Sequence, residues 1–358
     1  VVIPADLAVC PDCAREVMDP GNRRYGYPFT TCTACGPRYT VVNAMPYDRE
    51  RTTLQQFPLC EECRREYEDP SDRRFHAESI ACPECGPRLW LEGADGAREQ
   101  ADVLRSARRA ISEGRILAVR GIGGYLLAVD PFNSAAVERL RQRKNRPHKP
   151  FAVMARNAET LQGYVEADEA ALQLLASAQG PIVIMPTRPG AGFEGERLNP
   201  DNGTIGAMLP TSPLHQLLFE PLEGDPVPAF DLLVMTSGNR GGEPICITNA
   251  EARERLAGIA DMLLCHDREI NLRNDDSLFA VRGGGPQVWR RARGCAPDAI
   301  GLDRPLARSV LAMGAELKNA IAVGCKSRVV LSPHIGDLDT PEALAAFEKV
   351  VHELPRFL

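Results

Sequence analysis

The chain has 358 residues, of which 44% are hydrophobic and 25% are charged, with a formal net charge of −6. This composition is typical of a protein with two or three globular domains. The acidic balance argues against broad, sequence-independent nucleic-acid binding, which depends on many Lys and Arg side chains. Uninterrupted apolar stretches are short, as at 116–119, so no membrane span is predicted. The sequence shows no signal peptide, and we therefore expect a cytoplasmic protein.

The first quarter of the chain is dominated by Cys-x-x-Cys pairs. Two such pairs separated by about 15–20 residues supply the four thiolates of a closed, structural zinc site. Four pairs therefore predict two structural zinc ions. The alternative is disulfide bonding, which is typical of secreted proteins. The predicted ligands are Cys10, Cys13, Cys32, Cys35, Cys60, Cys63, Cys82 and Cys85.

These pairs belong to an internal repeat, because segments 10–38 and 60–88 share the same order of motifs. Each has a Cys-x-x-Cys pair, then Asp-Pro, Arg-Arg with an aromatic residue, and finally Cys-x-x-Cys-Gly-Pro-Arg. We expect each repeat to hold its own ion, although one ion between the outer pairs and one between the inner pairs is an alternative. His76, which has no counterpart in the first repeat, is either an extra ligand or a local hydrogen-bonding group. Region 1–92 has few periodic apolar positions, so zinc is expected to drive much of its folding.

After a predicted linker at 92–96 the pattern changes to alternating helices and strands, which predicts a mixed α/β domain over 97–298. Gly, Ser, Thr and Asn are concentrated in predicted loops at 121–124, 203–206 and 236–239. Beyond these, short strands predict the opening of another domain over 306–358. The predicted helices are 101–113, 134–144, 158–164, 169–178 and 250–257, and the predicted strands are 116–119, 125–129, 151–154, 182–185, 232–236, 309–312, 320–323 and 328–331.

A basic turn follows the predicted helix at 134–144. Lys144, Arg146 and Lys149 lie close together there, and Pro147 and Pro150 stiffen the backbone of the turn. The planar fork of Arg and the compact charge of Lys suit a triphosphate whose α-phosphorus is attacked. A solvated surface turn is the alternative.

Polar loops supply the other candidate ligand groups. Ser237 and Asn239 follow an apolar strand, at the end of the strand where α/β sheets commonly bind ligands, although a helix cap is the alternative. Segment 274–277 contains two adjacent carboxylates, which either hold Mg²⁺ or lie in a solvated turn.

Taken together, these motifs resemble the HypF family of hydrogenase-maturation carbamoyltransferases. The cysteine-rich region carries Asp19-Pro20-x-x-Arg23-Arg24-Tyr25, Cys32-x-x-Cys35-Gly36-Pro37-Arg38 and Arg73-Arg74-Phe75-His76-Ala77. The middle region is similar to the YrdC-type domain of threonylcarbamoyl-adenylate synthases, whose Lys-x-Arg and Ser-x-Asn pattern falls on Lys144, Arg146, Ser237 and Asn239. The resemblance implies a twisted-sheet α/β (α+β) YrdC-like domain, preceded by two zinc-finger repeats and followed by the start of an ATPase-type transferase domain.

The resemblance also implies an ATP-dependent carbamoyltransferase. The YrdC-like domain would join carbamate, derived from carbamoyl phosphate, to ATP with Mg²⁺, and the carbamoyl group would pass to the C-terminal cysteine thiol of HypE, toward the cyanide ligands of [NiFe]-hydrogenase. The alternatives are an RNA-binding module of zinc ribbons and a YrdC-like domain, and a small-molecule O-carbamoyltransferase, which lacks zinc repeats. The implied catalytic residues are Lys144, Arg146, Ser237 and Asn239, and the implied nucleotide contacts are Lys149, Tyr125, Ser212, Ser277 and Arg293.

Overall fold

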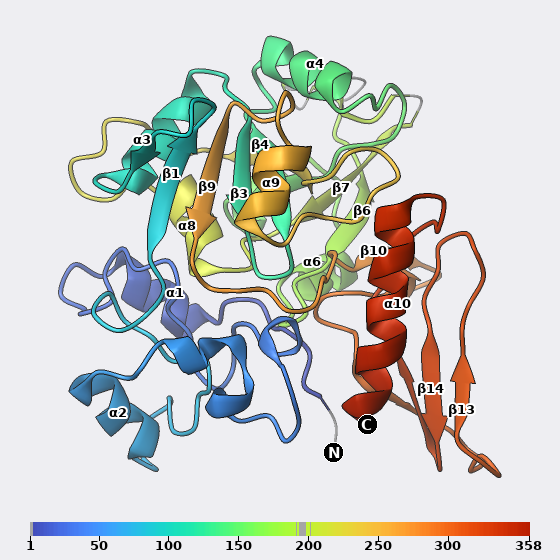
Figure 1. Cartoon of the computed structure of the whole chain (residues 1–358). Helices are drawn as coiled ribbons and strands as arrows, with labels where there is room; N and C mark the ends of the chain where they lie inside the picture. The colour runs from blue at the N-terminus through green and yellow to red at the C-terminus, as the bar shows by residue number, and fades with distance from the viewer. Residues whose placement is uncertain (1–2, 191, 193–197, 201) are drawn as a thin grey trace.

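A computed structural model describes residues 3–190, 192, 198–200 and 202–358 (Figure 1), so the first two residues of the predicted region 1–92 lie outside the described part. A cysteine-rich region with helices α1 (Pro11–Met18) and α2 (Glu61–Glu68) lies against one end of a central sheet. The long helix α10 (Pro341–Arg356) and a small second sheet lie beside these two parts.

The central sheet has the strand order β11-β10-β6-β7-β5-β8-β4-β3-β9-β1-β2 in the described part of the chain. Most neighbours are antiparallel, but β3 and β9, β5 and β7, and β6 and β10 are parallel pairs. This mixed sheet confirms the predicted α/β fold. Its strands are β1 (Leu89–Gly93), β2 (Arg98–Glu99), β3 (Leu117–Arg120), β4 (Tyr125–Val129), β5 (Val153–Ala155), β6 (Ile182–Pro186), β7 (Thr204–Met208), β8 (Leu232–Ser237), β9 (Met262–His266), β10 (Leu278–Arg282) and β11 (Gly285–Arg290).

Helices cover both faces of this sheet and bury two hydrophobic cores. Side chains of successive strand residues point to opposite faces, so Leu127 of β4 joins one core while its neighbours Leu126 and Ala128 join the other. The first core is covered by α4 (Ser134–Arg143), α5 (Ala158–Gln162), α6 (Glu169–Leu175) and α9 (Asn249–Arg255), and the second by α3 (Val103–Ser112) and α8 (Pro213–Phe219).

The cysteine-rich region is continuous with the sheet, so the prediction of a linker at 92–96 is wrong. Strand β1 pairs antiparallel with β9, and a tight turn after it leads into β2. The Asp95 carboxylate accepts a 3.0 Å hydrogen bond from the Ala97 N–H, which closes that turn. Three short 3₁₀ helices at Tyr39–Val41, Arg49–Arg51 and Thr53–Gln56 connect the two repeats. Thr53 Oγ1 also donates to the Glu269 carbonyl at 2.8 Å, which ties this connection to the α/β domain.

The predicted loop at 203–206 is instead the beginning of strand β7. Gly206 lies inside this strand, and a Cβ there would come 2.9 Å from Cγ2 of Ile182 on the neighbouring strand β6. The glycine therefore allows close packing between strands, and the sequence signal for a loop was misleading.

The C-terminal segment forms an antiparallel sheet of β12 (Ala299–Gly301), β15 (Arg328–Leu331), β14 (Ala322–Cys325) and β13 (Val310–Ala312), in that order. Leu354 and Phe357, at the end of α10, share a hydrophobic cluster with Ile3 and Tyr39, so the first and last parts of the described chain lie close together. No helix among the described residues combines the length and apolar character that a bilayer crossing requires.

Candidate functional site

The eight predicted zinc ligands form two separate groups of four sulfur atoms, one in each repeat. Within each group the ligand atoms all lie within 4.8 Å of one another. The distance between sulfur atoms is 3.6 Å for Cys10 and Cys32 and 3.7 Å for Cys60 and Cys82. A tetrahedron with Zn–S bonds of about 2.3 Å has sulfur–sulfur edges of about 3.8 Å, whereas bonded disulfide sulfurs are about 2.05 Å apart. The geometry fits two structural zinc ions, with one ion per repeat.

The backbone around each group is arranged to present N–H groups to sulfur. Cys10 is the N-cap of α1, and its sulfur accepts from the Cys13 N–H at 3.5 Å, while the Ala34 N–H donates to Cys32 at 3.4 Å. Such contacts favour the thiolate form that binds metal. His76 does not belong to the second group, because its ring packs against Tyr67 and Phe75.

The basic turn after α4 meets the polar loop after β8, as the candidate site requires. Asn145 adopts a φ of +47°, a left-handed conformation that Asn tolerates, and this ends the helix and reverses the chain. The Lys144 ammonium then donates to the carbonyls of Ser237 at 2.6 Å and Asn239 at 2.7 Å, and to Asn239 Oδ1 at 2.7 Å. Ser237 Oγ donates to the same Oδ1 at 2.8 Å. Three acceptors engage the three N–H groups of Lys144, so this side chain holds the loop.

Beside this loop lies a cavity of about 490 Å³. Arg146, Lys149 and Ser237 line it together with two carboxylates, Asp275 and Asp276. Lys144 and Asn239 stand behind this lining. Apolar side chains from the sheet form much of the remaining wall, namely Leu126, Phe151, Ile182, Ile184, Met235, Leu278 and Trp289. A cavity with an apolar wall and a few converging charges is the usual form of a small-molecule site.

Arg146 is held in place at the cavity wall by three kinds of contact. Its guanidinium donates to Thr236 Oγ1 at 3.2 Å and to backbone carbonyls of the turn, and it lies 5.3 Å from the ring centroid of Phe151. A cation fixed in this way needs little reorganisation when an anion binds, which is the arrangement that favours phosphate chemistry.

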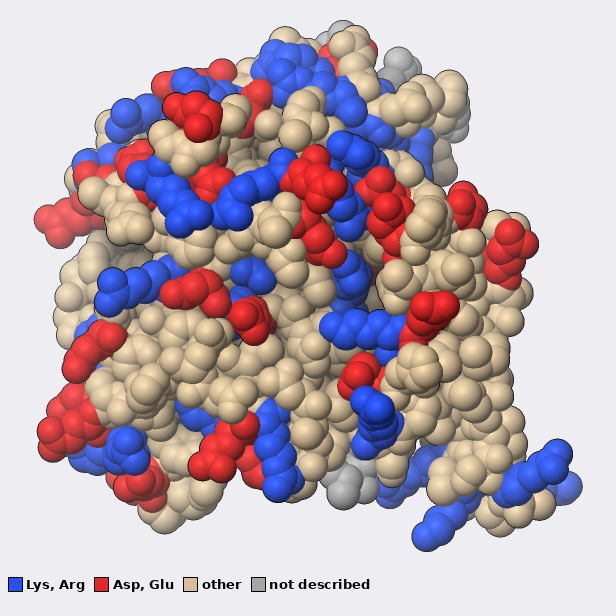
Figure 2. Space-filling model, in the orientation of Figure 1, with Lys and Arg blue, Asp and Glu red and all other residues tan. Residues whose placement is uncertain are grey.

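The cations of this site disfavour one another's charge. Burial, with smaller effects from Arg146 and Lys149, lowers the pKa of Lys144 from its ordinary 10.5 to about 7. Burial and the neighbouring Arg141 lower the pKa of Arg146 to about 10. The pKa of Lys149 is also lowered, by burial and by Arg146 and Arg290. A bound polyanion would relieve this repulsion. Elsewhere, Figure 2 shows Lys and Arg side chains interspersed with Asp and Glu over the face drawn, without one broad basic area.

The lowered pKa of Lys144 predicts that stability rises with pH. Between about pH 7 and 10.5 the unfolded chain binds a proton at this side chain that the folded chain does not, so the unfolding free energy increases across that window. The measurement is urea unfolding at several pH values. In the wild type, Lys144 should add about 1 kcal/mol per pH unit to the increase of the unfolding free energy in this window, and Lys144→Met should lack this contribution. Equal slopes for the variant and the wild type would contradict the assignment.

Four of the predicted nucleotide contacts lie away from the cavity lining and have partners inside the protein. The Tyr125 hydroxyl donates to Asn249 Oδ1 at 2.6 Å, and Ser212 caps α8. Ser277 Oγ donates to the Arg293 carbonyl at 2.8 Å. Arg293 donates to Asp276 at 2.8 Å and to the carbonyl of Gly180 at 2.7 Å. Arg293 thereby orients a carboxylate that does line the cavity.

Sequence reasoning missed residues that shape the site without a local motif. Arg141, in the last turn of α4, is buried and donates to the carbonyls of Arg146 at 2.6 Å and Lys149 at 3.2 Å. It also stacks 4.4 Å from the Phe151 ring centroid. Arg290 reaches the cavity from a distant part of the chain. Asp275, one of the two carboxylates that the sequence offered as Mg²⁺ ligands, also lines it. No local motif marks Arg141 in the sequence. Its contacts with the turn that follows α4 can be recognised only once the end of that helix is known.

Comparison with known protein families matches three consecutive parts of the chain. The Sua5/YciO/YrdC family, described as telomere recombination, matches residues 109–292. The HypF finger matches residues 9–42 and 59–92, and the HypF Kae1-like domain matches residues 305–358.

Individual relatives show the same relationship. Carbamoyltransferase HypF2 of Cupriavidus necator is 46% identical over 99% of this chain and 45% of its own length. A threonylcarbamoyl-AMP synthase of Nitrosococcus oceani is 28% identical over 45% of this chain and 84% of its own length. A crystal structure of full-length HypF in the phosphate- and nucleotide-bound form, 41% identical, superposes with a TM-score of 0.93 over 100% of this chain and 46% of that one. The chain spans about half the length of the HypF proteins it matches, and it belongs to the HypF family, with a Sua5/YciO/YrdC domain at its centre.

Proposed function

We propose that this chain carries the adenylation part of a HypF carbamoyltransferase. The observation that supports this most directly is the cavity at which Arg146, Lys149 and Ser237 converge, within the region that matches the Sua5/YciO/YrdC family. The substrates are ATP and carbamate derived from carbamoyl phosphate. A carbamate oxygen attacks the α-phosphorus of ATP. The bond between that phosphorus and the oxygen that joins the α- and β-phosphates breaks, and the products are carbamoyl adenylate and pyrophosphate.

The residues divide into those that face the substrates and those that support them. Arg146 and Lys149 offset the charge of the triphosphate and of the departing pyrophosphate, and Ser237 donates to a phosphate or carbamate oxygen. Lys144 and Asn239 act as positioning residues, because their contacts fix the Ser237 loop. Mg²⁺ usually binds through one or two carboxylates together with substrate phosphates, and Asp275 at the cavity wall fits that role. The ion would neutralise phosphate charge.

The later steps belong to the longer HypF protein. We infer that the carbamoyl group passes from the adenylate to the C-terminal cysteine thiol of HypE in the cytoplasm, as a step toward the cyanide ligands of [NiFe]-hydrogenase. The match of residues 305–358 to the HypF Kae1-like domain supports this order, because the transfer site would then follow the adenylation site along the chain.

The proposal predicts ATP–pyrophosphate exchange that depends on carbamate. Labelled pyrophosphate should enter ATP when the chain is incubated with Mg²⁺, ATP and ammonium bicarbonate, which generates carbamate. Carbamoyl phosphate, with and without an added acylphosphatase, serves as a second source of carbamate. L-threonine with bicarbonate is the informative control, since one relative is a threonylcarbamoyl-AMP synthase. Exchange that requires threonine, or the absence of exchange with every donor, would contradict the proposal.

A further inference from the structure

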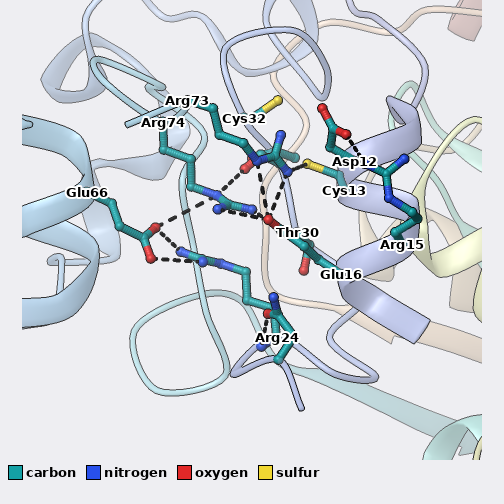
Figure 3. A network of polar contacts seen from close by, with 12 residues as sticks. Asp12, Cys13, Arg15, Glu16, Arg24, Thr30, Cys32, Glu66, Arg73 and Arg74 are labelled. Carbon is teal, nitrogen blue, oxygen red and sulfur yellow. Dashed lines mark hydrogen bonds and ion pairs between the residues drawn. The ribbon is translucent and has the colours of Figure 1, made fainter. Parts of the chain in front are cut away.

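The two fingers exchange arginine contacts across their interface (Figure 3). Arg73 of the second finger donates to the sulfur of Cys13, a ligand in the first finger, at 3.0 Å. Arg23 of the first finger donates to the sulfur of Cys63, a ligand in the second finger, at 2.9 Å. Each of these arginines therefore contacts the metal group of the other repeat.

The neighbouring arginines reinforce this exchange and are almost fully buried. Arg24 donates to Glu66 of α2 at 2.5 Å and to the Ala81 carbonyl at 2.9 Å. Arg74 pairs in the same way with Glu16 of α1 and donates to the Thr31 carbonyl at 3.0 Å. Arg24 and Arg74 are 2% and 4% exposed, so both ion pairs depend on the fingers being folded together.

These contacts have the form of a twofold interface within one chain. In the sequence repeat, Arg23 corresponds to Arg73, Cys13 to Cys63, and Glu16 to Glu66. The arginine contacts to sulfur, to glutamate and to backbone carbonyl described above run from the first finger to the second and again from the second to the first, as in the self-complementary interface of a symmetric dimer. The Arg-Arg motif in each repeat is explained by the partner repeat, which accounts for its presence in both.

The chemistry of a four-thiolate zinc site makes such contacts important. Four thiolates and one Zn²⁺ leave a net charge of −2, and a guanidinium that donates to sulfur offsets this charge in a partly buried position. Outer groups of this kind orient the ligands, and their loss commonly weakens metal affinity about 10- to 100-fold. Here the outer group of each site is an arginine that belongs to the other finger.

We propose that the two zinc sites are thermodynamically coupled, with each site completed by the arginine of the opposite finger. Loss of zinc from one finger releases the arginine that supports the other site, so the second ion is held less tightly. Coupling of this kind is reciprocal, and each ion strengthens the binding of the other. The finger pair then loads and releases zinc as a unit.

The test uses the full chain and follows each site separately. Zinc-loaded protein is mixed with a chelator and N-ethylmaleimide, and alkylation of the peptides that contain Cys10 and Cys13 or Cys60 and Cys63 is timed by mass spectrometry. Arg73→Gln should expose the first finger's cysteines about 10- to 100-fold faster, and Arg23→Gln should do the same for the second finger's cysteines. The second site in each variant should follow with a smaller acceleration.

Arg15→Gln and Arg65→Gln are matched controls. These residues occupy equivalent positions on α1 and α2 and make exposed ion pairs within their own finger, with Asp12 and Glu62. They should keep wild-type alkylation rates. If Arg73→Gln is purified with fewer than two zinc ions, the alkylation rate is measured instead on Arg73→Lys, which keeps the positive charge but lacks the planar guanidinium. Faster alkylation confined to one finger in each variant, with the other finger at the wild-type rate, or control-like rates in both fingers, would overturn the coupling.

Discussion

Arg146→Ala is expected to lower carbamate-dependent ATP–pyrophosphate exchange by about two orders of magnitude, the usual effect of deleting one preorganised charge from a phosphate site. Arg146 lines the cavity and is fixed by Thr236 and by stacking on Phe151, so its charge lies where the phosphates are proposed to bind. Ser237→Ala should act in the same direction. Initial rates of label exchange at saturating ATP provide the measurement.

Lys144→Ala should reduce the same exchange, by about one to three orders of magnitude, through the loop that it holds. Without its ammonium, the carbonyls of Ser237 and Asn239 lose their shared donor. Arg139→Gln is the control, since Arg139 lies on the same helix and donates to the Gly114 carbonyl on the side of α3. Arg141 is unsuitable as a control because it shapes the basic turn. If Arg139→Gln were as impaired as Arg146→Ala, the specific phosphate-binding role of Lys144 and Arg146 would be refuted, and the basic side chains of this region would have a general electrostatic role.

The sequence predicted most accurately the features that depend on close spacing. Four thiolates at Cys-x-x-Cys spacing have few geometric options, and the predicted pairing within each repeat matches the structure. Strand β4 was predicted with its observed bounds because Tyr125–Val129 is a continuous apolar segment, which is typical of a fully buried strand. Such features are local, so the composition of a short segment determines them.

Features that depend on distant partners were not predictable in this way. Strand β1 was read partly as a linker because Glu92 and Gly93 are poor strand residues, yet Glu92 is buried in ion pairs with Arg253 and Arg98. The cavity likewise combines Arg146 with Asp275, which reaches it from a loop far along the chain. The Arg-Arg motifs were read as parts of the repeat and as markers of the family but were given no contacts, because their partners lie in the other finger.

Removing zinc should unfold the finger region while the central sheet keeps its cores. Structural zinc sites in finger peptides contribute apparent binding energies of about 10–16 kcal/mol near pH 7, and this energy is folding energy. The fingers' own buried clusters are small and consist largely of the ligand cysteines themselves. The central sheet has two larger cores whose fully buried residues lie outside the fingers, apart from Leu91 of β1.

Elemental analysis should find two zinc ions per chain, and prolonged chelation under reducing conditions should make region 9–88 sensitive to protease while region 103–290 stays protected. Cys32→Ser should lose at least one ion and become sensitive in the same region, because three thiolates leave the tetrahedron of the first finger incomplete. Cys325→Ser is the matched control, since Cys325 is exposed on β14 and outside both sulfur groups. A metal-free chain whose fingers resist protease as well as the zinc-loaded chain would show that packing against the sheet through contacts such as Thr53 to Glu269 is sufficient to fold them.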